Sequence, residues 1–195
     1  MEQMPVTVVT ARGPDLRALP DGGVVVLHVH GVVITNPLPG FLREIGERVG
    51  VGGGGADPTV ACMLAVAVLG GSDHRRRDVG AIAPGLDAVE LRDDLEARYR
   101  PGPWFDFVIG HDGPMWLLSN HCTSWLLPRL ERFGVADRFE RILVSDVLAV
   151  AKPSAAAFAE LQGRDDLVFY DDSQCNVDAA RSFGIDAHLV AITAR

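Results

Sequence analysis

Two histidines stand in an otherwise apolar run near the start of the chain. The run, VVVLHVHGVVI at 24–34, is rich in the β-branched residues typical of strands that are buried on both faces. His28 and His30 lie two residues apart near its carboxyl end, and residues at this spacing on a strand share a face. An imidazole can ligate a transition metal, exchange a proton near neutral pH or act as a nucleophile, so the pair is a candidate for each role.

Further polar residues follow other segments that are typical of strands. They are Ser119 and Asn120 in WLLSN, Ser145 and Asp146 in RILVSD, and Asp171 and Asp172 in LVFYDD, with Lys152 in the loop VLAVAKPS. Ligands of parallel α/β sheets bind outside the carboxyl ends of the strands. We therefore expect one pocket that combines a cation, hydroxyl and amide groups, carboxylates and two imidazoles. His121, directly after Asn120, is a further candidate for contact with a substrate.

The elements that must position these residues alternate between strand and helix signals in the second half of the chain. Strands are expected at 116–120, 141–146, 167–172 and 187–190, and helices at 123–135, 154–163 and 176–184. Short strands separated by helices of about ten residues are typical of βαβ units. The sequence therefore predicts an α/β fold, a Rossmann-like parallel sheet with helices on both faces.

The stretch between the first strand and residue 101 has a different pattern. Segments 41–50, 57–70 and 86–100 look helical, the first two are joined by VGGGGA, and the Pro-rich PGPW marks the return to the sheet. We expect a core formed by 20–36 and 101–195, a small helical cap inserted at 37–100, and an N-terminal extension at 1–19.

Three stretches in order resemble motifs of the haloacid dehalogenase (HAD) superfamily, especially its small-cap phosphatases and dehalogenases. They are LLSN at 117–120, AKPS at 151–154 and FYDDSQCNVDAARSFG at 169–184. The resemblance implies that the Ser119 hydroxyl binds the substrate anion, and the position of Asn120 and His121 directly after it makes them further candidates for substrate contact. The resemblance also implies that Lys152 neutralises the nucleophile and the substrate, and that Asp171 and Asp172 hold a metal ion.

The same resemblance aligns His28-Val29-His30 with the first motif of the family, Asp-x-Asp, without a gap. His28 would then stand at the position of the nucleophile and His30 at that of the general acid/base. Because the nucleophilic carboxylate is replaced, we predict that ordinary Mg²⁺-dependent phosphatase activity is weak or absent. We expect a divalent metal held by His28, His30, Asp171 and Asp172, and imidazole ligands favour Zn, Fe, Mn or Ni over Mg.

Three functional hypotheses follow from these residues. The first is a divergent HAD-like hydrolase that acts on a small phosphorylated or carboxylated metabolite, with His28, His30 and Lys152 as catalytic groups. The second is a catalytically silent binding or regulatory protein, whose histidines merely pack in a decayed site. The third is a non-hydrolytic metalloenzyme on the same scaffold.

Composition narrows the class of partner. The formal net charge is −8 over 195 residues, which argues against nucleic acid or an anionic membrane surface as the partner. Cys62, Cys122 and Cys175 are odd in number and lack a CxxC spacing, as expected for reduced thiols. With no basic start followed by a signal-like apolar run, the expected location is the cytoplasm. The oligomeric state is left open.

Overall fold

The computed structural model describes residues 14, 19–20, 22–48 and 87–190. Two compact units divide the chain: Met1–Thr35 with Pro101–Arg195 form one, and Asn36–Arg100 form the other. The expected helix at 57–70 and most of the expected N-terminal extension lie outside the described residues. Each unit is therefore considered by itself.

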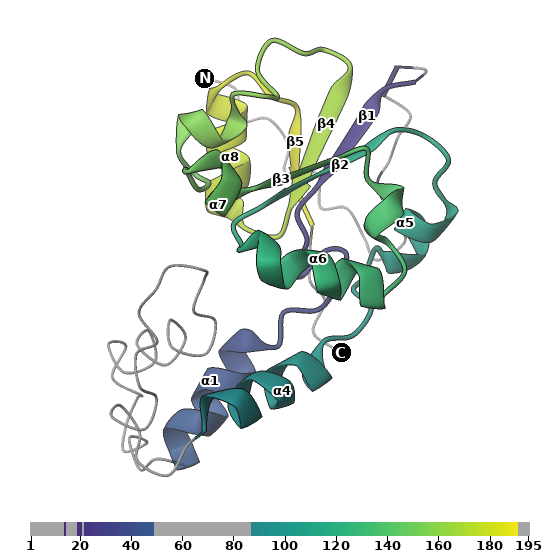
Figure 1. The fold of residues 1–195 in the computed structure, drawn as a ribbon. Coiled ribbons are helices and arrows are strands. Elements are labelled where there is room, and N and C mark those ends of the chain that lie inside the picture. The colour runs from purple at the N-terminus through teal and green to yellow at the C-terminus, as the bar shows by residue number, and fades with distance from the viewer. Residues whose placement is uncertain (1–13, 15–18, 21, 49–86, 191–195) are drawn as a thin grey trace. The chain divides into compact units, whose positions relative to one another are not determined.

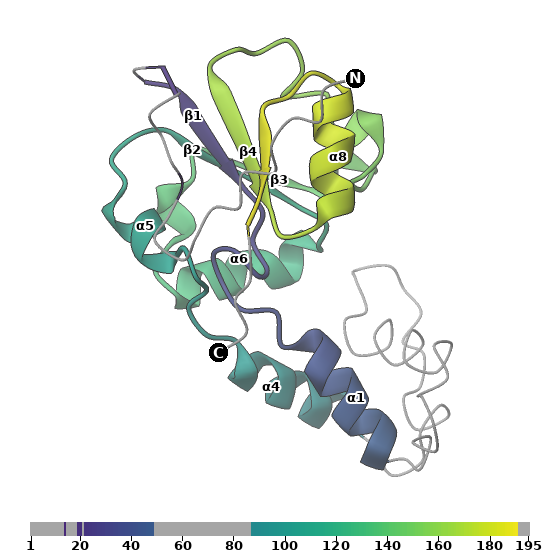
Figure 2. The same ribbon diagram turned by 180° about the vertical axis from the view of Figure 1, so that it is seen from behind.

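The first unit is built on a five-stranded sheet in the order β3-β2-β1-β4-β5 (Figures 1 and 2). Its strands are β1 Val24–Leu27, β2 Met115–Ser119, β3 Arg141–Val144, β4 Leu167–Asp171 and β5 Ala187–Leu189. Every neighbouring pair is parallel. The predicted α/β fold with a parallel sheet is confirmed, and the strands that end in Leu27, Ser119 and Asp171 lie side by side.

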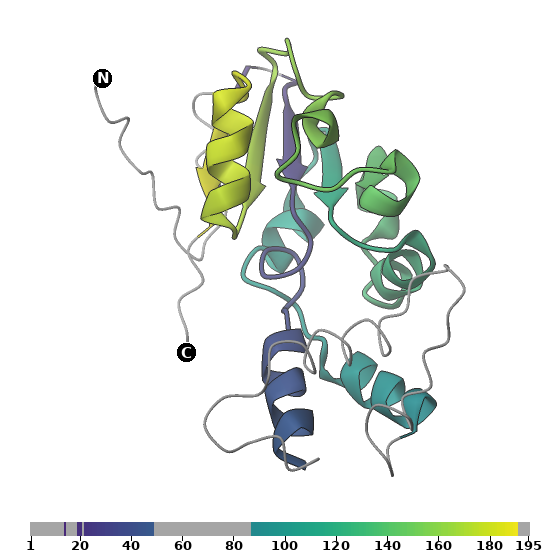
Figure 3. The same ribbon diagram turned by 90° about the vertical axis from the view of Figure 1, so that its left-hand side faces the viewer.

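Helices pack on both faces of this sheet. Helix α8, Gln174–Ser182, lies alongside β4 and β5 (Figure 3), and its Val177 joins Phe158 and Phe169 in the core on that face. On the opposite face, Trp104 precedes helix α5, Phe105–Gly110, and its ring centroid lies 4.8 Å from that of Tyr170. Residues of β4 thus alternate between the two buried faces, as expected for a central parallel strand.

The first strand is shorter than the apolar run predicted. β1 ends at Leu27, and the chain then turns so tightly that the carbonyl oxygen of Val29 accepts hydrogen bonds from the amides of Val32, Val33 and Ile34. Gly31 adopts a φ of 82°, which favours glycine. His28 is therefore the first residue beyond the strand, and the expectation that His28 and His30 share one strand face is wrong.

Residue Gly102 holds this turn against the returning chain. Its amide donates to the carbonyl oxygen of Val33 at 2.9 Å, and a Cβ at this position would lie 2.6 Å from the carbonyl oxygen of Val32. Only glycine permits so close an approach of two backbones. The turn that follows His28 is thus fixed by backbone contacts rather than by the strand ladder.

Two other elements differ from the prediction. β3 ends at Val144, and Ser145 begins the short helix α7, Ser145–Leu148. The expected helix at 154–163 is reduced to a 3-10 turn, η3, at Ala155–Phe158. Helix α6, Thr123–Arg132, agrees with the expected 123–135 segment, and Gly134 after it has a φ of 68°.

The second unit contains two described helices, α1 Leu38–Arg48 and α4 Ala88–Arg98. Arg98 of α4 donates to Glu44 of α1 at 2.6 Å and lies over the ring of Phe41, 5.0 Å from its centroid. Both helices were predicted from the sequence. None of the helices in the described part of the chain has the length and hydropathy needed to cross a membrane.

Candidate functional site

Lys152 lies at the centre of the polar groups at the strand ends. Its side chain is fully buried, and Nζ donates to Oδ2 of Asp171 at 2.6 Å and to the carbonyl oxygen of Leu118 at 2.7 Å. Nζ also lies 3.1 Å from Nδ1 of His28. Burial lowers the pKa of Lys152, while Asp171 opposes that shift. Lys152 is the only lysine of the chain, since every other basic residue apart from the histidines is arginine.

Asn120 holds the backbone of Lys152 in place. Its side-chain amide donates to the carbonyl oxygen of Lys152 at 2.8 Å, and its Oδ1 accepts from the Lys152 amide at 2.8 Å. This paired contact joins the end of β2 to the loop that carries the lysine. The structure therefore gives Asn120 a positioning contact, whereas the sequence led us to expect contact with substrate.

The two carboxylates after β4 have different surroundings. Asp171 is fully buried, and its oxygens also accept from the Ser173 amide at 2.8 Å and from the Asn176 side chain at 3.1 and 3.2 Å. Burial would raise the pKa of Asp171, but Lys152 and His28 together with these bonds hold it below its usual value. Asp172 is partly exposed, and burial together with the charge of Asp171 raises its pKa to about 6.

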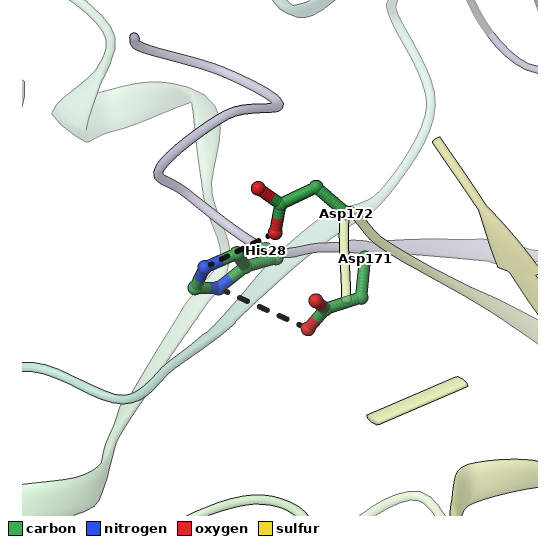
Figure 4. A group of neighbouring side chains, drawn as sticks. All are labelled: His28, Asp171 and Asp172. Atoms are coloured by element: carbon green, nitrogen blue, oxygen red, sulfur yellow. Dashed lines mark ion pairs between the residues drawn. The ribbon is translucent and has the colours of Figure 1, made fainter. Parts of the chain in front are cut away.

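His28 faces Asp171 with one ring nitrogen and Asp172 with the other (Figure 4), and the nitrogen that faces Asp171 also faces Lys152. Nδ1 lies 4.0 Å from Oδ2 of Asp171, and Nε2 lies 3.8 Å from Oδ1 of Asp172. Burial, followed by the charge of Lys152, lowers the pKa of His28 to about 4. The imidazole is therefore neutral near pH 7.

His28, Asp171 and Asp172 could hold a metal ion, because one ligand atom from each lies within 4.8 Å of the others. They are the one such group in the described part of the chain. Two of the three already bond to Lys152, however, through Oδ2 of Asp171 and Nδ1 of His28. The third, Asp172, has no such bond to Lys152. The group therefore fits a metal ion only in part, because Lys152 occupies one ligand atom of Asp171 and one of His28.

His30 lies beside His28, with ring centroids 6.3 Å apart, but its hydrogen-bonding and stacking partners are different. Its Nε2 lies 2.8 Å from Nη1 of Arg129, and its ring stacks on that of His121 with centroids 4.9 Å apart. The same Nη1 lies 3.3 Å from Nε2 of His121. Burial, followed by His121, lowers the pKa of His30 well below its usual value. The structure thus places His30 outside the group formed by His28, Asp171 and Asp172.

Arg129 was missed by reasoning from the sequence. It is buried on α6 beside Leu126 and Leu130, at the spacing of the apolar face of that helix. A basic residue on an apolar face is the signal that could have identified it, because a charged side chain is rarely fully buried unless it has partners.

The remaining strand-end residues fall into two kinds. The hydroxyl of Ser119 is buried and has no hydrogen-bond partner among the described residues. Ser145 and Asp146 instead stabilise the loop before α6: the Ser145 hydroxyl bonds to His121 backbone groups, and Asp146 accepts from the Thr123 amide and hydroxyl, both at 2.7 Å. Of these residues, Ser119 is the one with unused bonding capacity.

Comparison with known proteins identifies the fold. No protein-family model matches the sequence, and no curated protein resembles it significantly. Among solved structures, a HAD phosphatase from Thermococcus onnurineus aligns with a TM-score of 0.55 at 18% identity, covering 89% of this chain and 88% of the other. The chain has the HAD fold.

Two further HAD structures align to a similar extent. One is L-2-haloacid dehalogenase from Xanthobacter autotrophicus, solved with chloropropionic acid covalently bound. It aligns with a TM-score of 0.56 at 20% identity, and the alignment covers 89% of this chain and 79% of the dehalogenase chain. The other is the putative HAD hydrolase YfnB from Bacillus subtilis, solved with magnesium. It aligns with a TM-score of 0.54 at 17% identity, and the alignment covers 85% of this chain and 86% of the YfnB chain. At these identities the likeness establishes the HAD fold alone.

Proposed function

We propose that this chain is an atypical hydrolase of the HAD fold that acts on a small anionic metabolite, phosphorylated or carboxylated. The proposed site is formed by His28, Ser119, Lys152 and Asp172. The observation that carries the proposal is the fully buried Lys152 at the meeting point of three strand ends.

A buried lysine is a poor choice for stability alone. Taking an ammonium and a carboxylate out of water costs several kcal/mol for each ion, and apolar residues of similar volume are often as stable or more stable. Every other cationic side chain of this sequence, histidine aside, is arginine, so position 152 is the single exception. The compact ammonium of Lys152 fits three acceptors in a space that excludes water, an arrangement that is common at functional sites.

The Ser119 hydroxyl supports an anionic ligand. A buried hydroxyl without a partner destabilises the fold by about 1–3 kcal/mol. A phosphate or carboxylate oxygen would accept its hydrogen bond and remove that penalty. The resemblance to the second HAD motif assigns Ser119 the same role.

Hydrolysis here would not proceed through a carboxylate nucleophile at position 28. With a pKa of about 6, Asp172 is largely ionised at pH 7 and is basic enough to accept a proton near neutrality. In the proposed step, water attacks the substrate, its proton passes to Asp172, and the bonding electron pair leaves with the departing group. A neutral His28 beside Asp172 would bind an oxygen of the substrate by a hydrogen bond rather than exchange a proton near pH 7.

A divalent metal could be held by His28, Asp171 and Asp172 only if the Lys152 bonds to two of them were broken. It would supply positive charge to the substrate anion. If His28 ligates, Zn, Fe, Mn or Ni is favoured over Mg. His30 is proposed as a neighbour of the site through His121 rather than as a ligand of this group.

One observation favours the second hypothesis, a binding protein without turnover. Lys152 and Asp171 satisfy each other, and their remaining bonds go to Leu118, His28, Ser173 and Asn176. Such a network can hold a ligand pocket rigid without performing chemistry.

The experiment is a substrate panel of small phosphate monoesters and 2-haloacids, assayed for released phosphate or halide without metal and with Zn²⁺, Mn²⁺ or Mg²⁺. We expect turnover of at least one substrate, reduced at least roughly 100-fold in Lys152→Met. Glu160→Gln, which breaks the exposed Arg141–Glu160 pair, is the matched control. Ligand-induced stabilisation without turnover would favour the binding protein, and the absence of both would reject both functions.

A further inference from the structure

The three N–H bonds of the Lys152 ammonium each face one acceptor. An ammonium has three donors and no acceptor. The acceptors are Oδ2 of Asp171, the carbonyl oxygen of Leu118 and Nδ1 of His28, at 2.6, 2.7 and 3.1 Å. The orientation of the ammonium is therefore fixed, and its third N–H is directed at the His28 ring.

This contact determines which nitrogen of His28 carries the proton. A lone pair on Nδ1 accepts the hydrogen bond from Lys152, whereas an N–H on Nδ1 would face an ammonium proton at 3.1 Å. The alternative acceptor for an Nδ1 proton is the carbonyl oxygen of Leu118, which lies 3.4 Å away and already accepts from Lys152. That distance is longer than the 3.1 Å to Lys152, and an N–H on Nδ1 would leave two protons facing each other, so the geometry disfavours the alternative.

We infer that Lys152 is a positioning residue that fixes His28 in the Nε2–H tautomer. His28 then presents a hydrogen-bond donor at the end of β1, and neither ring nitrogen offers a metal a free lone pair while Lys152 stays in place. The inference rests on the proposed function, because it concerns how the same site receives its ligand.

The consequence concerns the chemical class of the ligand. The Nε2–H of His28 faces Oδ1 of Asp172 at 3.8 Å, which is too long for a hydrogen bond. An oxyanion of the ligand can therefore accept this proton directly. A metal ion could bind Nε2 of His28 only if the proton moved from Nε2 to Nδ1, and the hydrogen bond from Lys152 to Nδ1 would then break. His28 accordingly binds a phosphate or carboxylate oxygen rather than a metal ion.

The direct test is the tautomer of His28 in ¹⁵N-labelled protein at pH 7, read from long-range ¹H–¹⁵N correlations of the imidazole rings. The His28 signals are assigned by their loss in His28→Gln. We expect the Nε2–H pattern in the wild type, and a mixed or Nδ1–H pattern in Lys152→Met. Arg129→Met, which removes the buried cation beside His30, should leave the His28 pattern unchanged. An Nδ1–H pattern in the wild type would overturn the inference, and this result needs no variant to fold.

A metal titration provides a second readout. We expect Zn²⁺ to bind at least ten-fold more tightly to Lys152→Met than to the wild type, and the gain to disappear in Lys152→Met/His28→Gln. Equal affinity of a folded Lys152→Met and the wild type, with an unchanged tautomer, would also overturn the inference. Neither measurement requires turnover, so a failed substrate panel would reject the hydrolase while leaving the tautomer result intact.

Discussion

Replacing Lys152 by methionine tests the central ion pair of the site. The substitution preserves most of the apolar volume but leaves Asp171 as a buried carboxylate without its cation. Removing one partner of a buried ion pair costs about 3–5 kcal/mol. The bonds from Ser173 and Asn176 remain, so we expect a value near the lower end, about 3 kcal/mol. For a chain of this size that lowers Tm by roughly 6–12 °C.

The loss should depend on pH with a definite sign. In the wild type the pKa of Asp171 is held low, so its contribution to stability is present above its unfolded value of 3.8 and is lost as the pH falls through the folded pKa. In Lys152→Met, burial instead raises the pKa of Asp171, so the penalty is present near pH 7 and is relieved as the pH falls. The difference in free energy of unfolding between wild type and variant should therefore shrink from pH 7 towards pH 5.

Urea denaturation at pH 7 and pH 5 measures both effects. The matched control is Glu160→Gln, which breaks an ion pair whose side chains are 41% and 48% exposed and should cost less than about 1 kcal/mol. Lys152→Met/Asp171→Asn should recover much of the loss, because the unpaired charge is gone. Two results would contradict a stabilising buried ion pair between Lys152 and Asp171. One is a loss of free energy of unfolding in Lys152→Met no larger than that in Glu160→Gln, and the other is an equal loss at both pH values.

Two further predictions concern the pocket itself. Ser119→Ala should leave the free energy of unfolding unchanged or raise it, because the buried hydroxyl has no partner among the described residues. The same variant should bind sulfate at least ten-fold more weakly. Denaturation and calorimetry measure the two effects, and a large loss of stability would contradict the first. Sulfate should bind more tightly as the pH falls from 8 to 5, because Asp172, with a pKa of about 6, loses its charge while His28, with a pKa of about 4, stays neutral. Asp172→Asn should flatten that dependence, and an unchanged slope would show that another group titrates.

The sequence predicted the sheet and the strand-end location of the polar residues, because apolar β-branched runs and glycine-terminated helices are local signals. It did not predict where β1 ends. That boundary depends on the turn at Gly31 and on the backbone contact with Gly102, some 70 residues later in the chain. The period-2 pattern alone placed His28 and His30 on one strand face.

The separation of the two histidines depends on partners that no local pattern shows. Arg129 reaches His30 from a helix 99 residues away in sequence, and Lys152 reaches His28 across 124 residues. Burial, reinforced by these neighbouring cations, lowers the pKa of both imidazoles, and the sequence could not show that burial. The roles proposed for the individual site residues remain predictions.

The most direct test of the account is Mg²⁺-dependent hydrolysis of an aryl phosphate by His28→Asp, compared with wild type. If His28 stands where HAD-type hydrolases carry their nucleophile, the wild type should be slow, by roughly 10⁴–10⁶-fold relative to an enzyme with that carboxylate. His28→Asp should then gain at least roughly 100-fold over wild type, while His111→Asp, whose ring stacks on Phe107, should gain nothing. Rapid Mg²⁺-dependent turnover by the wild type that Asp172→Ala abolishes, or a folded His28→Asp that binds Mg²⁺ and gains no activity, would contradict the account.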